Sequence, residues 1–138
     1  MVLSVNHPSP HVALVTFSEK TSRDTFSSGT IEDVVSTIDG LIEDPDTNAV
    51  VLTGTGNFFS AGGPVDKFDE AIDAGVIREL VESMTGHLHP LLLRMRRTPT
   101  VFVGAINGAA AGGGLGLALS TDYRISNGKA KLAAAFFR

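Results

Sequence analysis

The sequence predicts one domain of the α/β class with parallel strand pairing, on three observations. First, apolar runs typical of strands alternate along the chain with stretches of helical periodicity, an order in which right-handed helical crossovers join parallel strands. Second, 138 residues with 43% hydrophobic and 19% charged side chains can build a single core and are unlike a disordered chain. Third, two of the expected strands are each followed by a glycine-rich loop and then a helix.

The first half of the chain is expected to contain two strands with a helix between them. Alternating apolar residues over 11–17 predict a strand, and residues 18–28 a polar loop. Ser27 or Ser28 is expected to cap the helix that follows, which ends near residue 43 and gathers its apolar residues on one face. The β-branched run at 49–54 then predicts a buried strand.

The middle of the chain predicts two helices. The glycine-rich loop 55–66 leads into a short helix that places Pro64 at its first position. A longer helix begins near residue 76, and we expect His89-Pro90 to break or kink it, because proline removes a backbone hydrogen bond and restricts the residue before it.

The last part of the chain predicts three short strands and one helix. Residues 100–106 are typical of a strand, followed by the loop "NGAAAGGG" and the helix "LGLALS". Two further short strands, 122–126 and 130–134, are expected around the "NGK" turn at 127–129.

Composition argues against several classes of function. The net charge is −4 and no dense Lys/Arg cluster occurs, so no nucleic-acid partner is expected. Cysteine is absent, which excludes disulfides and thiolate chemistry. His87 and His89 are two residues apart and would face different directions on a helix, so no metal site is expected. No stretch predicts a signal peptide or a membrane span, and we expect an intracellular protein, in the cytoplasm or in an organelle if a targeting signal lies beyond the C-terminus.

Two segments with the same design carry the expected chemistry. "VVLTGTGNFFSAGG" and "VFVGAINGAAAGGG" each run from a strand through a loop of small residues into a helix. Small residues leave backbone N–H groups free to point at a ligand oxygen, and two converging donors make an oxyanion hole. Neither loop has the lysine of a P-loop or the G-x-G-x-x-G spacing of a dinucleotide site. A structural reading stays open, in which residues 112–116 only let a helix pack closely on a sheet.

Three stretches resemble the crotonase superfamily, the enoyl-CoA hydratases and isomerases. They are "SRDTFSS" (22–28), "DPDTNAVVLTGTGNFFSAGG" (44–63) and "AINGAAAGGGLGLALSTDYRIS" (105–126). The first is similar to that family's loop reading Arg-Asn-Ala-Leu/Phe-Ser, and the other two resemble its two oxyanion segments. The resemblance covers nearly the whole chain but only the N-terminal half of a family member. It implies an incomplete crotonase-like ββα superhelix whose C-terminal half is absent, with residues 1–138 forming a partial acyl-CoA-binding domain.

The same resemblance implies the site residues. The backbone N–H groups of Gly63 and Gly113 would be the catalytic donors that hold a thioester carbonyl oxygen as an enolate develops. CoA would enter as part of the substrate, with no separate cofactor. The residues implied to bind the acyl-CoA or enoyl-CoA substrate are Arg23, Thr25, Ala61, Gly62, Phe68 and Phe136.

The chain departs from the family where hydratases carry two acid–base glutamates. Gly116 stands at the first of these positions and Phe136 at the second, and Pro64 replaces a common Asp or Asn. Processing of the thioester by double-bond isomerisation is therefore favoured over hydration, with the required carboxylate expected beyond Arg138.

Other interpretations remain at this stage. The chain could be a truncated, catalytically inactive remnant that binds acyl-CoA or another protein, and a dehalogenase-like or hydrolase-like relative would need a nucleophilic carboxylate that the motifs do not supply. The full-length form is expected to be a trimer-based homo-oligomer. In the 138-residue chain, a missing half would leave a sheet edge and the apolar stretch "AAAFF" uncovered.

Overall fold

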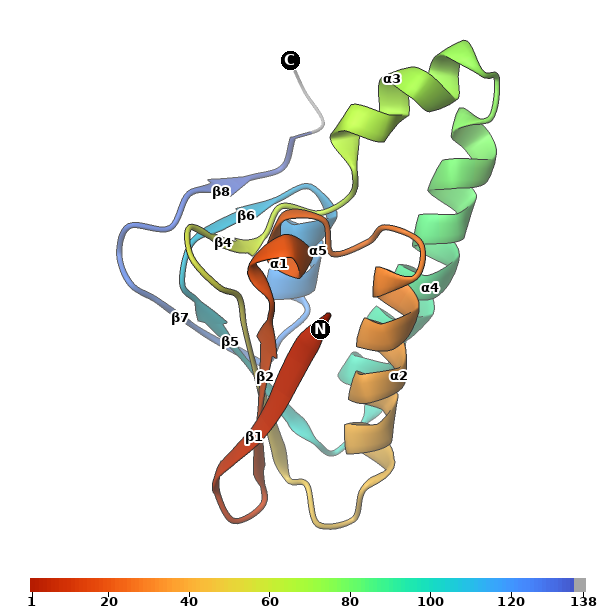
Figure 1. Ribbon diagram of the computed structural model, residues 1–138. Helices are drawn as coiled ribbons and strands as arrows, with labels where there is room; N and C mark the ends of the chain where they lie inside the picture. The colour runs from red at the N-terminus through yellow and green to blue at the C-terminus, as the bar shows by residue number, and fades with distance from the viewer. Residues whose placement is uncertain (136–138) are drawn as a thin grey trace.

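Two sheets and a pair of long helices organise the chain in the computed structural model, which describes residues 1–135 (Figure 1). The strands are β1 (Leu3–Ser9), β2 (Val12–Phe17), β3 (Ala49–Thr53), β4 (Phe58–Ser60), β5 (Val101–Ile106), β6 (Ala109–Ala111), β7 (Tyr123–Ser126) and β8 (Leu132–Ala133). The helices are α1 (Glu19–Arg23), α2 (Thr30–Glu43), α3 (Val65–Asp73), α4 (Ile77–Arg97) and α5 (Gly113–Leu119). The α/β class predicted from the sequence is confirmed.

The larger sheet has the strand order β1-β2-β3-β5-β7. The neighbours β2 and β3, β3 and β5, and β5 and β7 are parallel, which confirms the expected pairing. Strand β1 is antiparallel to β2 and was not predicted. Its sequence contains Pro8, a residue that sheets accept only at an edge because it has no N–H to donate, and β1 is an edge strand.

A second sheet of three short strands, β4-β6-β8, was missed by the sequence prediction. Its parallel strands lie in segments that the sequence assigned to glycine-rich loops or to a hairpin. The expected pairing of 122–126 with 130–134 is wrong, since β7 joins the larger sheet and β8 the smaller one. The pairs β3/β4 and β5/β6 each give one strand to each sheet before a helix, the repeating unit of a ββα superhelix, whereas β1 and β2 both belong to the larger sheet.

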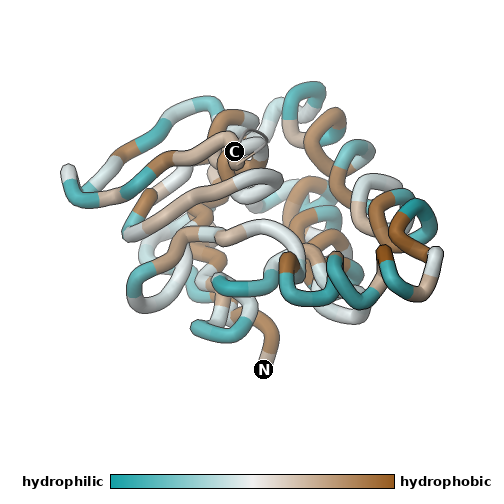
Figure 2. Tube along the Cα trace, turned by 90° about the horizontal axis from the view of Figure 1, so that it is seen from above, coloured by the Kyte–Doolittle hydropathy of each residue, from teal (hydrophilic) through white to brown (hydrophobic). Residues whose placement is uncertain are grey.

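The core lies between the larger sheet and the helices α2 and α4, which pack side by side (Figure 1). Phe17 and Phe59 are fully buried, and their ring centroids are 6.2 Å apart. Seen from above, the helices alternate between hydrophobic and hydrophilic positions, as expected of helices with one buried face (Figure 2). The buried residues of these two helices are Ile31, Val34, Ile38, Leu88, Leu91 and Met95.

Several helix ends differ from the sequence prediction. The cap of α2 is Gly29, at φ +83°, rather than Ser27 or Ser28, and Pro64 is the N-cap of α3 rather than its first helical residue. Of the break or kink expected at His89-Pro90, the break is wrong, because α4 continues through this position. The carbonyl that loses its helical partner is that of Gly86, an exposed residue, so it can bond to water instead.

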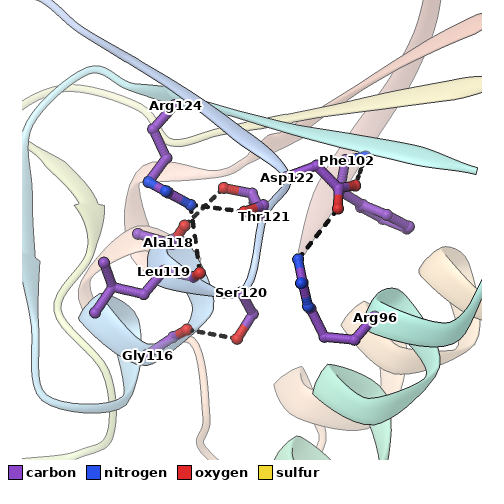
Figure 3. A network of polar contacts seen from close by, with 9 residues as sticks. All are labelled: Arg96, Phe102, Gly116, Ala118, Leu119, Ser120, Thr121, Asp122 and Arg124. Carbon is purple, nitrogen blue, oxygen red and sulfur yellow. Dashed lines mark hydrogen bonds and ion pairs between the residues drawn. The ribbon is translucent and has the colours of Figure 1, made fainter.

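Asp122 connects α4, β5 and the segment after α5 (Figure 3). Its Oδ2 accepts a hydrogen bond from the backbone N–H of Phe102 at 2.8 Å, and its own N–H donates to the Phe102 carbonyl at 2.8 Å. Its Oδ1 lies 3.2 Å from Nη1 of Arg96, whose side chain is exposed. The carboxylate therefore fixes the start of β5 beside the chain that enters β7.

We expect Asp122→Ala to lower the free energy of unfolding by about 1–3 kcal/mol, because the Phe102 amide loses its acceptor. Arg96→Ala is the matched control: it removes only an exposed ion pair and should cost about 0–1 kcal/mol. Urea unfolding of the two variants measures the difference. Equal losses would show that the ion pair, and not the backbone hydrogen bond, is the stabilising contact.

No helix within residues 1–135 has both the length and the apolar character needed to cross a bilayer.

Candidate functional site

The two glycine-rich loops leave neighbouring parallel strands of the smaller sheet. Phe58 of β4 pairs with Ala109 of β6, so the chain emerges from both strands at the same edge. Gly62, which follows β4, has a φ of +91°. A Cβ at this position would lie 2.9 Å from the carbonyl oxygen of Ala111 and 3.4 Å from the nitrogen of Gly113. The two loops therefore touch, and the contact requires glycine at position 62.

The backbone amides of Gly63 and Gly113 are the donors that the family resemblance implies. Within residues 1–135, neither amide donates a hydrogen bond to another group of the protein. The neighbouring amides are occupied, since Gly62 donates to Oγ of Ser60 at 3.3 Å and Ala61 to the Ser22 carbonyl at 2.8 Å. The contact between the loops thus brings together two segments that each present an available N–H group, from Gly63 in the first and from the start of α5 in the second.

Apolar side chains form the wall beside these amides. A Cβ on Gly63 would meet the end of the Met84 side chain and would lie 3.7 Å from Cζ of Phe68. A Cβ on Gly113 would lie 2.9 Å from Cδ2 of Phe26 and 3.5 Å from Cδ2 of Leu88. Phe68 was predicted to bind substrate and lies next to Gly63. Sequence reasoning missed Phe26, Met84 and Leu88 as site residues, although the four-residue spacing of Met84 and Leu88 does place them on one face of α4.

Thr25 and Ala61 hold the first loop in place. Thr25 is buried, and its hydroxyl contacts the Thr21 carbonyl at 2.9 Å and Oγ of Ser60 at 2.7 Å. The Ala61 amide bonds to the segment just before Thr25, as described above. The Thr25 hydroxyl is thus engaged in anchoring the end of β4.

Arg23 lies near the loops but has partners of its own. Its side chain is exposed, pairs with Glu19 at 2.9 Å and sits over the ring of Phe58 at 5.5 Å from the centroid. Phe58 is half-buried under Arg23, whereas its neighbour Phe59 is fully buried. Phe136, the remaining residue predicted to bind substrate, lies outside the described residues.

The space around Gly116, where the resemblance places the first glutamate of a hydratase, is open. Gly116 lies in α5, and a Cβ placed on it would have no neighbouring atom within 4 Å. The missing carboxylate at this position is therefore a property of the sequence and is not imposed by packing.

A cavity of about 330 Å³ opens next to the first loop, lined by Arg23, Asp24, Ala61, Gly63 and the start of α3. A larger cavity of about 590 Å³ lies at the β1–β2 turn. This turn is at the opposite end of β2 from the loops (Figure 1). There the Thr47 hydroxyl and the Asp46 amide bond to Asp44 and hold the pKa of its carboxyl below the usual value. Only the smaller cavity touches one of the two predicted donors.

Known proteins are similar to this chain in sequence and in fold. A family model described as enoyl-CoA hydratase/isomerase matches residues 8–138. A Mycobacterium tuberculosis protein named "Probable enoyl-CoA hydratase" is 33% identical over 126 residues, which are 91% of this chain and 47% of the relative. Thus the chain spans about half the length of such curated relatives.

Solved structures agree with the sequence comparison. The crystal structure of an enoyl-CoA hydratase from Bacillus anthracis superposes with a TM-score of 0.82 at 27% identity, covering 96% of this chain and 50% of that one. The structure of Pseudomonas aeruginosa DspI superposes with a TM-score of 0.77 at 32% identity, covering 96% and 52%. In this fold, the parallel strands β4 and β6 end at the same edge of the smaller sheet, and a glycine-rich loop follows each of them. With a family model that matches almost its whole length, the chain belongs to the enoyl-CoA hydratase/isomerase family, the crotonase superfamily.

Proposed function

We propose that this chain binds an acyl-CoA thioester and that the N–H groups of Gly63 and Gly113 stabilise the negative charge that develops on the thioester oxygen as an enolate forms. The observation that carries the proposal is the contact between the two loops. A Cβ added to Gly62 would lie 3.4 Å from the Gly113 nitrogen, and on each side of this contact one backbone N–H group donates no hydrogen bond within the described residues. Preorganised backbone donors of this kind favour a transition state because they need no reorganisation when the charge appears.

The apolar wall supports a site for the acyl group. Phe68, Met84 and Leu88 flank the two amides and would keep water away from the thioester. A site poor in water strengthens hydrogen bonds to an oxyanion, because the local dielectric constant is low. In this proposal, CoA enters as part of the substrate and no separate cofactor takes part.

Isomerisation of an enoyl-CoA fits the chain better than hydration. Hydration by two carboxylates needs both an acid and a base, and residues 116 and 136 are glycine and phenylalanine. Because the chain spans about half the length of its relatives, we propose that the residue that moves the proton, the remaining wall of the acyl site and any trimer contacts belong to the rest of a longer protein.

The second candidate is a binding remnant without turnover. It is favoured by the same missing carboxylates, and by the exposure of every residue of β7 at the edge of the larger sheet. Exposed edge strands are prone to pair with other chains, so association of this chain through β7 stays a prediction.

Calorimetry with acetyl-CoA, together with exchange of its α-protons in D₂O followed by ¹H NMR, distinguishes the two candidates. We expect binding with slow exchange that depends on the protein, because an oxyanion hole makes the α-proton more acidic even with solvent as the base. Binding without exchange would leave only the remnant. The absence of binding would reject the proposed thioester chemistry and leave only a remnant that associates with other chains.

A further inference from the structure

One face of the larger sheet carries no charged side chain on the strands β2, β3, β5 and β7. Because side chains alternate along a strand, the parallel registers align those of this face in rows. The chain has 15 acidic and 11 basic residues, and none of them stands in these rows. We call this surface the outer face, and its rows are Val12-Ala49-Val101, Leu14-Val51-Val103-Tyr123 and Thr16-Thr53-Ala105-Ile125.

The two faces of this sheet differ in how far they are covered. Helices α2 and α4 pack on the inner face (Figure 1), where Leu52 and Phe102 are fully buried. On the outer face, Tyr123 is 62%, Ile125 58% and Val101 46% exposed. The strand spacing and the rise per residue give this face a size of about 20 Å by 17 Å. Contiguous apolar patches of several hundred Å² mark interaction sites on soluble proteins.

Little polar surface would have to be desolvated to cover the outer face. The Thr53 hydroxyl already donates a hydrogen bond to the Ala105 carbonyl at 2.9 Å, so it needs no water. A cavity of about 260 Å³ is lined by Thr53, Ala105 and Ile125 together with the ends of β5 and β7. The face therefore offers a partner both apolar area and a hollow for a projecting side chain, and burying it leaves no charge without a partner.

A second copy of this chain is the partner that fits such a face. Contact about a two-fold axis places the same patch of both copies together, so any charge on the patch would meet a like charge. The chain as a whole has a net charge of −4, whereas the outer face has none. Two sheets pack face to face about 10 Å apart with interdigitating apolar side chains.

The size of the face sets the strength of this contact. Two patches of these dimensions bury a total area at the low end of specific interfaces, below about 1,200 Å². We therefore expect a reversible dimer whose dissociation constant is in the micromolar range.

We propose that the outer face joins two copies of this chain in solution, sheet against sheet. The inference goes beyond the proposed function, because neither the glycine-rich loops nor a thioester takes part in the contact. It also differs from strand pairing at the free edge of β7, which would use backbone hydrogen bonds and leave the side chains of β2, β3 and β5 uncovered.

Analytical ultracentrifugation over a concentration series through the micromolar range tests the proposal with matched variants. Val101→Lys and Ile125→Lys should each raise the dissociation constant of the dimer by about ten-fold or more, because each buries two like charges. Val76→Lys and Ile72→Lys are the controls. Val76 is the N-cap of α4 and Ile72 lies in α3, and their exposed fractions of 46% and 58% equal those of Val101 and Ile125. Both controls should dimerise as the wild type does.

Three outcomes would overturn the proposal. The first is a wild type that stays monomeric throughout the series. The second is a dimer that is lost in Ile125→Lys and kept in Val101→Lys, because pairing at the edge of β7 would then be the contact. The third is equal weakening by the control variants, which would show a general effect of added charge.

Tyr123 gives a readout that needs no variant and so covers the case in which a lysine variant does not fold. It is the only tyrosine of the chain, which has no tryptophan, so the tyrosine emission of the protein comes from the outer face. Quenching of this emission by acrylamide should become weaker as the concentration rises through the dimer transition. Constant quenching while dimers form would place the contact on another surface and overturn the proposal.

Discussion

Gly113→Ala is expected to remove a large part of the polarisation of a bound thioester carbonyl, whereas Gly63→Ala should retain most of it. The Cβ on residue 113 would press on Phe26, a ring that is 2% exposed and packed in the core, so the backbone of the loop must move. The Cβ on residue 63 would meet the end of Met84, a flexible side chain that can move aside. The two substitutions are chemically identical and differ in what surrounds them.

The ¹³C chemical shift of the carbonyl in bound [1-¹³C]acetyl-CoA measures this difference directly. The wild type and Gly63→Ala should both move the resonance downfield by similar amounts, and Gly113→Ala should move it clearly less. Loss of one oxyanion donor lowers rates by about 10²–10³-fold, and α-proton exchange should fall in parallel. A wild-type carbonyl shift in Gly113→Ala, with the protein folded, would contradict the role of this amide.

Gly114→Ala and Gly116→Ala should change stability in opposite directions, although both lie in α5. A Cβ on residue 114 would collide with the carbonyl oxygen of Ser60 and lie 2.6 Å from its Oγ, where β4 passes behind the helix. Because a backbone atom cannot rotate away, we expect a loss of about 1–3 kcal/mol or more. A Cβ on residue 116 meets no atom within 4 Å, and alanine there should add about 0.5–1 kcal/mol by helix propensity.

Urea unfolding midpoints of the two variants test the pair, with equal slopes as the check that both unfold in the same way. If Gly114→Ala is as stable as the wild type, α5 does not approach β4 as closely as the structure places it. Destabilisation by Gly116→Ala would mean that the space around this position is filled in solution.

The elements with strong apolar periodicity were predictable from the sequence. Strands β2, β3 and β5 and helices α2 and α4 lie where alternation or helical spacing places them, because these segments bury one face or both. Strands β4 and β6 were missed for a physical reason. Each has only three residues, and flanking glycines and asparagine are typical of loops, so their pairing depends on partners more than forty residues away.

The burial of the Asp24 carboxyl beside the first loop is another feature that could not be predicted from the sequence. In the sequence Asp24 is one polar residue of a loop, and no local pattern distinguishes it from the exposed carboxylates of α3. Only the packing of the segment at 22–26 against the first loop buries its oxygen and leaves it without a donor.

The sequence by itself determined the α/β class, the two strand–loop–helix segments and the absence of carboxylates at positions 116 and 136. These properties are local, since periodicity and residue identity depend on near neighbours along the chain. The tertiary structure decided which glycines matter and why. Gly62 allows the two loops to touch, Gly114 lets α5 lie against β4, and Gly116 faces open space. Glycine is chemically the same at all three positions, and the distance to the nearest atom from another segment is fixed only when the chain folds.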